Sequence, residues 1–395
     1  MTWSTGDAKI ARMESAPHYS FRDVLLAPAK ALSAKKIFVM TCFLILALLV
    51  YDLFTYLAIA LDSERVGTFY SVYGLLPVTI PALTFWLAWM VYVLGCIASV
   101  LAVMLGFFAV SALCIEEIRG NQFFSTSGVL RFSFRRLPQL FLSEAAIILF
   151  VAFIVLLAVI VGLITRIPYV GEWVYAIFFV IPNFIIALFV VFIIAVLAVS
   201  IILLPAVTAA ERRGETFTSI LETFSTIIRQ PVRWILYTAY SLVAAKVCGF
   251  VYAYFCYRAI QFLTAATSLG AGEKVWRLLR SGISHLPVKT PLVNETFNIF
   301  PGIDWSFSVA AWLRSGADEA AGYLMSAALF IVFVSIFGYM FAIIATGQAR
   351  GYAAIRYFKD GHKIADEEPL FFQEEPVNPP IDKGQEGEDS SRPEK

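Results

Sequence analysis

Six long runs of apolar residues constrain this chain more than any other feature of its sequence. They fall near residues 37–61, 83–115, 142–164, 183–210, 232–257 and 322–347. A helix needs about 20 apolar residues to cross the hydrocarbon core of a bilayer, so each run is long enough for one crossing. Hydrophobic residues make up 59% of the 395 residues and charged residues 15%, which excludes an ordinary soluble domain. The sequence therefore predicts an all-α polytopic integral membrane protein with six transmembrane helices.

Two of the runs are too long for a single crossing. Apolar character begins near Leu75 ahead of the second run and near Trp173 ahead of the fourth. Prolines stand early in both, at Pro77, Pro81 and Pro182. Because proline interrupts a helix, we expect a short interfacial helix that breaks at proline before each tilted span.

Lysine and arginine gather on one side of the predicted spans. Residues 1–36, 116–141, 211–233 and 348–395 hold six, four, four and seven of them. The two short opposite loops hold one each, Arg65 and Arg166. The positive-inside rule then predicts a multi-pass protein of the cell membrane, the inner membrane of a bacterium, with both termini in the cytoplasm.

A Glu/Gln-x-Arg-Gly signature ends the second, fourth and sixth runs. Its members are Glu117, Arg119 and Gly120, then Glu211, Arg213 and Gly214, then Gln348, Arg350 and Gly351. The match continues after the first two copies, where Arg136-Leu137-Pro138 corresponds to Arg229-Gln230-Pro231. This placement indicates an internal repeat.

Amphipathic segments lie between the signatures and the next spans, and we call them elbows. In the segment after Gly214, Phe217, Leu221, Phe224 and Ile228 recur at helical spacing, with polar residues on the other face. Residues 123–141 are similar, and residues 20–36 have the same character before the first span. We expect the elbows to lie flat in the cytoplasmic interface.

The predicted unit is an elbow, a span going out, an outer turn and a span coming back to the signature. Three units cover about 20–122, 123–214 and 215–364, and the third carries an outer loop, 258–320, in which EKVWRLLRSGI suggests a short amphipathic helix. Each unit crosses twice, so the repeats are parallel and a pseudo-threefold axis along the membrane normal is expected. Residues 1–36 form a cytoplasmic segment, 37–364 the membrane domain and 365–395 a disordered acidic tail.

Two interpretations of the signature remain open. In the first, the glycine ends the helix and the arginine meets the helix dipole or lipid phosphate while the acid pairs locally. In the second, Arg119, Arg213 and Arg350 form a cationic ring for phospholipid headgroups, or the elbows dock a soluble partner. Arginine suits phosphate because its guanidinium is a planar fork.

Few ionisable residues stand within the spans. Asp52 in the first span and Lys246 in the fifth could pair, snorkel separately or mark a polar cavity. Glu144 is expected at the interface, near the start of the third span. These residues are candidates for function because a charge inside a bilayer is costly.

Signatures of catalysis are missing from the sequence. His18, His285 and His362 stand far apart, and there is no Walker, GxGxxG, HExxH or GxSxG motif. The five cysteines lie in apolar stretches without a CxxC pair. We expect no enzyme activity, no catalytic residue, no metal and no cofactor, and no binding of nucleic acid.

Two local stretches resemble known families. The run from Pro205 to Arg229, a proline before an acid-bearing helix end and then a Ser/Thr-rich elbow, resembles the membrane domain found beside bacterial glycerophosphodiester phosphodiesterases. That resemblance covers two elbow regions and implies a polytopic fold, but no phosphodiesterase domain is present. Ala349-Arg350-Gly351 is similar to the coupling motif of membrane components of energy-coupling-factor transporters, whereas the other copies read Ile-Arg-Gly and Arg-Arg-Gly.

The expected function is that of a non-catalytic membrane component, transport-related or lipid-handling, whose partners are membrane lipids, anionic ones included. The alternative is a membrane scaffold or assembly factor that binds a soluble or membrane protein through the elbows and the outer loop. The repeated cationic helix ends, with Asp52 and Lys246, motivate the first. The elbows and the long loop motivate the second.

Overall fold

The computed structural model describes residues 18–62, 66–74, 76–77, 81, 83–121, 125–211, 215–286 and 316–368. Its six longest helices are long and apolar enough to cross a membrane, which confirms the predicted all-α membrane fold. Arg213, Gly214, most of the predicted acidic tail and part of the outer loop lie outside the described residues.

The structure describes twelve α-helices along the chain. They are α2 (Phe21–Leu25), α3 (Ala27–Ala31), α4 (Ala34–Asp62), α5 (Val66–Tyr73), α6 (Trp86–Ile118), α7 (Thr126–Ile164), α8 (Val170–Val174), α9 (Val180–Ala210), α10 (Thr216–Arg229), α11 (Pro231–Ala271), α12 (Glu273–Ser284) and α14 (Gly316–Asp360). A π-helical segment, η1 (Tyr175–Phe179), joins α8 to α9, and a 3-10 turn, η2 (Ile364–Asp366), follows α14.

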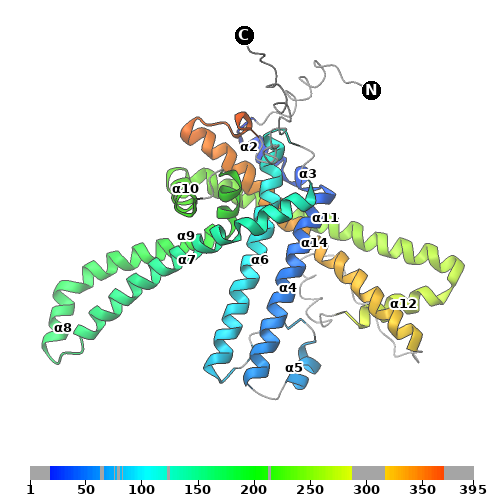
Figure 1. Cartoon of the computed structure of the whole chain (residues 1–395), viewed down its shortest axis with the longest axis horizontal. Coiled ribbons are helices and arrows are strands. Elements are labelled where there is room, and N and C mark those ends of the chain that lie inside the picture. Colours follow the sequence, from blue (N-terminus) through cyan, green and yellow to red (C-terminus); the bar gives the residue numbers. More distant parts are fainter. Residues whose placement is uncertain are drawn as a thin grey trace, which may run out of the picture.

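The six long helices form three hairpins, α4–α6, α7–α9 and α11–α14, which diverge from one end of the molecule (Figure 1). We call that end, where α2, α3, α10 and the last turns of α6, α9 and α14 gather, the convergent end. The opposite ends, near α5, α8 and α12, are the tips. The order of the hairpins matches the predicted units, while their relation as repeats about an axis stays a prediction.

Several predicted boundaries differ from the structure. The helix does not break at Pro182, because α8, η1 and α9 follow one another without a gap from Val170 to Ala210, and the π-helical segment η1 ends just before this proline. The second elbow is not separate either, because α7 runs unbroken through Pro138. The matching Pro231 does begin a new helix. In the predicted outer loop, α11 continues to Ala271 and α12 confirms the short amphipathic helix.

Small side chains bring the three returning helices together at the convergent end. The alanines there are no more than 3% exposed: Ala109 and Ala112 of α6, Ala206, Ala209 and Ala210 of α9, and Ala349 and Ala353 of α14. Small residues let helix backbones approach closely, which favours van der Waals packing where lipid removes the hydrophobic driving force between helices. Farther out the hairpins separate, and only 6% of the most apolar stretch of α7 is buried, against 50% in α6.

Helix α10 turns its polar face toward the protein. Ser219, Thr223 and Thr226 are buried, whereas Phe217 and Ile228 are 70% and 59% exposed. This is the reverse of a helix on a soluble domain, where the apolar stripe faces the core. The arrangement supports the predicted position of the elbow in a membrane interface, with its apolar face in the lipid.

Close approach also joins α14 to α11. A Cβ at Gly347 would overlap the Ser241 hydroxyl, and one at Gly351 would lie 3.2 Å from the Tyr237 ring. The two glycines are four residues apart and therefore share one face of α14. They let the backbones of the third hairpin meet.

We predict that Gly347→Ala destabilises the protein by about 1–3 kcal/mol, the usual cost of overpacking. Thermal unfolding in a mild detergent measures the change. Gly162→Ala in α7 is the matched control, because its Cβ would have no atom within 4 Å and helix propensity favours alanine there by about 1 kcal/mol. Adding Ser241→Gly to Gly347→Ala should restore stability. Equal effects of the two alanine substitutions would contradict close packing at Gly347.

Candidate functional site

The first residue of each signature ties the two legs of its own hairpin together. In the first hairpin, Glu117 of α6 forms an ion pair with Lys36 of α4, with 2.7 Å between Oε2 and Nζ. Lys36 is 1% exposed, and it also donates to the Lys30 carbonyl at 3.0 Å. The buried ammonium is therefore satisfied by a charge and a carbonyl.

In the other two hairpins the corresponding contact is a hydrogen bond from a glutamine and involves no cation. Gln139 of α7 donates to Glu211 at 3.2 Å and to Ser219 of α10 at 2.9 Å, so it joins the hairpin to its following elbow. Gln348 of α14 donates to the Thr238 hydroxyl of α11 at 2.9 Å. The first residue of the signature therefore forms a hydrogen bond or ion pair between the two helices of each hairpin near the convergent end.

Arg119 joins the three hairpins to one another. Its side chain is completely buried, and Nη1 donates to Glu116 Oε1 at 2.8 Å. Nη2 donates to the carbonyl of Ala210, the last residue of α9, at 3.0 Å and also pairs with Glu367, which follows α14. One guanidinium therefore connects the ends of α6, α9 and α14.

The structure distinguishes the three glycines of the signature. Gly120 ends α6 with φ 94°, and the Asn121 N–H donates to the Glu116 carbonyl at 2.9 Å, as expected for a glycine cap. Gly214 is outside the described residues, and α9 ends before it at Ala210. For Gly351 the predicted helix end is wrong, since α14 continues to Asp360.

Burial explains why α14 continues past the third signature. Tyr352, Ala353, Ala354 and Ile355 are each no more than 3% exposed, so unwinding there would expose packed apolar surface and unpaired backbone groups. Arg350 lies inside the helix in consequence and is 9% exposed. Of the arginines proposed to form a cationic ring, Arg119 is engaged by protein groups, whereas Arg350 forms no ion pair with a described residue.

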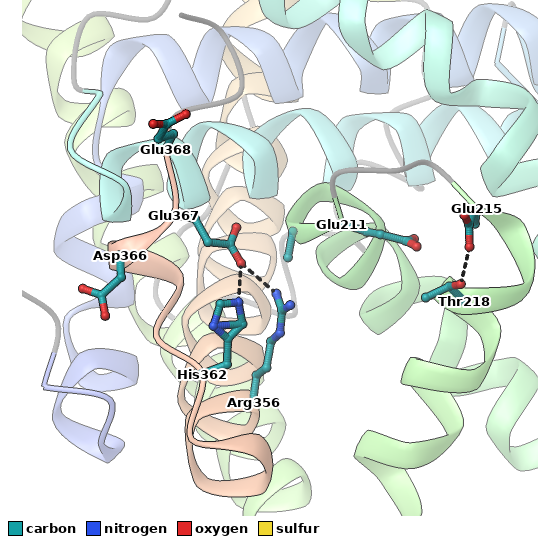
Figure 2. Close-up of a pocket in the computed structure, with 9 residues that line it drawn as sticks. Glu211, Glu215, Thr218, Arg356, His362, Asp366, Glu367 and Glu368 are labelled. Carbon is teal, nitrogen blue, oxygen red and sulfur yellow. Dashed lines mark hydrogen bonds and ion pairs between the residues drawn. The ribbon is translucent and has the colours of Figure 1, made fainter. Parts of the chain in front are cut away.

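A recess of about 590 Å³ opens beside this network (Figure 2). Its polar lining comes from the ends of α9 and α14, the start of α10, and the segment after α14: Glu211, Glu215, Thr218, Arg356, His362, Asp366, Glu367 and Glu368. Glu367 accepts from His362 at 2.9 Å and from Arg356 at 3.4 Å. The recess is acidic, and one of its acids, Glu367, is already paired with Arg119 and Arg356.

The segment after α14 is held by the beginning of the chain. Ile364 is fully buried, and the Ala365 N–H donates to the Tyr19 hydroxyl at 2.8 Å. The Tyr19 ring packs against Tyr357, with 4.9 Å between the ring centroids, and burial raises the pKa of the phenol above its usual value. Glu367 is thereby fixed in position for Arg119.

The polar residues of the spans remain apart. Lys246 is exposed on α11, and Asp52 Oδ1 is buried on α4 with no hydrogen-bond partner among the described residues. The structure therefore does not form the Asp52–Lys246 pair. Glu144 is buried within the protein and accepts from the Ser200 hydroxyl of α9 at 2.7 Å, while its predicted place at the membrane interface stays a prediction.

Sequence reasoning missed most of the partners of the signature. Glu116, three residues before Arg119, could have been found from helical spacing, and Lys36 from its place at the start of a span. Gln139 is the one polar residue of the short stretch from Leu137 to Leu142. Glu367 has no signal, because only tertiary packing brings it to α6.

Comparison with protein-family models, with curated proteins and with solved structures finds no match. The two family resemblances therefore remain predictions. Within the described ranges, no group of three or more His, Cys, Asp or Glu side chains is arranged to hold a metal ion.

We predict that Arg119→Leu destabilises the protein by about 3–5 kcal/mol, because it removes one partner of a buried ion pair, that with Glu116, and the contact between α6 and α9. Thermal unfolding in detergent tests this against Arg131→Leu, an exposed arginine of α7, for which a change within about 0.5 kcal/mol is expected. Arg119→Lys keeps the charge without the planar fork and should fall between them. If Arg119→Leu is no worse than Arg131→Leu, the guanidinium does not join the hairpins.

Proposed function

We propose that this chain is a non-catalytic component of the cytoplasmic membrane that handles phospholipid in a transport-related role, with both termini in the cytoplasm. The observation that carries the proposal is the reversed amphipathic α10, whose polar face meets the protein while Phe217, Leu221 and Ile228 point outward. A helix exposing such a face needs a lipid surface to cover it.

The separation of the hairpins supports the same function. Both legs of α7–α9 expose large apolar side chains along most of their length, so lipid can reach several flanks of this hairpin. Near its tip, Tyr169 and Trp173 are 84% and 71% exposed. Aromatic residues with a polar atom favour the headgroup level of a bilayer. A protein of this shape organises lipid between its hairpins as well as around them.

The alternative is a scaffold that binds a protein partner, and the acidic recess at the convergent end is the observation that favours it. Its carboxylates would attract a basic segment by charge. In that case the elbows anchor the chain in the membrane, and nothing is moved across it.

We predict that the purified protein retains phospholipid through detergent exchange and speeds movement of a headgroup-labelled phospholipid between leaflets of reconstituted vesicles. Lipid analysis of the purified protein and bleaching of the label by a membrane-impermeant reductant measure the two effects. Protein-free vesicles give the baseline. Retention without faster movement would favour the scaffold, and absence of both would reject lipid handling.

A further inference from the structure

We propose that Arg350 and Thr346 of α14 form a binding site for a phosphate group, and that the group is carried by a phospholipid headgroup. The inference deepens the proposed function and rests on it for the identity of the lipid. The observation behind it is an arginine, 9% exposed, that has no carboxylate partner among the described residues.

Arg350 differs from four other cations at the convergent end. Lys36, Arg119, Arg356 and Lys359 each have a carboxylate oxygen within 3.4 Å. Arg350 is 9% exposed, forms no ion pair with any described residue, and its buried Nε has no hydrogen-bond partner. A buried charge without a partner is strongly unfavourable, so an anion bound there would gain a charge-assisted hydrogen bond that the protein does not supply.

The sequence explains the difference between the first and third signatures. Arg119 finds Glu116 three residues earlier on its own helix. The residue three before Arg350 is Gly347, which carries no side chain and packs against α11. The third copy therefore keeps the cation and replaces the local carboxylate by a close helix contact.

A second unpartnered donor lies beside the arginine. Thr346 is fully buried, and its Oγ1 has no hydrogen-bond partner among the described residues. Residues four apart lie on the same face of a helix, about 5–6 Å apart at Cβ. A hydroxyl and a guanidinium on one face suit the oxygens of a phosphate, which can accept from both.

The position of Arg350 along α14 indicates that the phosphate belongs to a lipid. One turn before it, a Cβ at Gly347 would lie 3.8 Å from Ala27 of α3, and one turn after it Ala354 packs with Val24 of α2. Arg350 therefore lies at the level of the first elbow, which the sequence predicts to lie in the cytoplasmic interface of the membrane. Phospholipid phosphates occupy that level of a bilayer.

Titration of delipidated protein tests the site, in a non-ionic detergent without phosphate. The probe is dioctanoyl phosphatidic acid, with dioctanoylglycerol as the lipid that lacks phosphate and inorganic phosphate as the anion that lacks acyl chains. Native mass spectrometry counts the bound probe, and the shift in thermal unfolding gives its affinity. We expect saturable binding of phosphatidic acid and no equivalent effect of dioctanoylglycerol.

Arg350→Gln should weaken binding of phosphatidic acid about ten- to a hundredfold, as expected for loss of charge-assisted bonds, and Thr346→Val by a smaller factor. Arg131→Gln, which removes an exposed arginine at the same end, should bind like the unaltered protein. The Arg350→Gln protein should fold, because the substitution removes no described polar contact. If it does not fold, the Thr346→Val protein tests the site instead.

Equal affinity in Arg350→Gln and unaltered protein would overturn the site, as would failure of the unaltered protein to bind phosphatidic acid. If inorganic phosphate binds as tightly as phosphatidic acid, the phosphate chemistry stands and the lipid source is wrong. The proposed function fails differently, because the unaltered protein would then retain no phospholipid at all. Unchanged retention in Arg350→Gln would remove this site alone.

Discussion

The structure depends on a buried arginine that serves three helices at once. Arg119 caps α6, donates to the last carbonyl of α9 and pairs with Glu367 beyond α14. In a bilayer, helices gain little from hydrophobic burial against one another, so small residues and polar contacts must supply the contact energy between hairpins. Both are concentrated at the convergent end, where alanines bring the backbones together and Arg119 joins their ends. The long legs are then free to diverge.

The elbows follow from the same constraint. A polar network at the membrane surface needs covering by groups that can hydrogen-bond to it, and α10 supplies them. Its Glu222 accepts from Lys359 at 2.5 Å and from Tyr352 at 3.2 Å, both of α14. With its polar face engaged inside, α10 must turn its apolar face outward, which is stable only beside lipid. The polar interior of this end and its apolar exterior therefore have one cause.

Hydropathy was sufficient to predict the spans, because the length of a membrane crossing is set by the bilayer and not by tertiary contacts. The signature also predicted where along the helices the polar contacts lie, at the convergent end. Helical spacing predicted which residues of α10 are polar on one face and apolar on the other. The roles within the signature were not predictable. The spacing that identified Gly351 as a helix end carries no information on Tyr352–Ile355, whose burial extends α14. Nor could local sequence show that Arg119 would find Glu367, 248 residues away, while Arg350 would find no carboxylate.

All three hairpins extend in the same direction from the convergent end (Figure 1). Labelling of single cysteines with a membrane-impermeant thiol reagent in sealed vesicles tests it most directly, in a chain whose five native cysteines have been replaced. The exposed positions to compare are Ser125, Glu215 and Lys363 at the convergent end, and Gly67, Arg166 and Gly270 near the tips. We expect the first three positions to label together from one side of the membrane and the last three together from the other. Labelling of Ser125, Glu215 and Lys363 from different sides would contradict it.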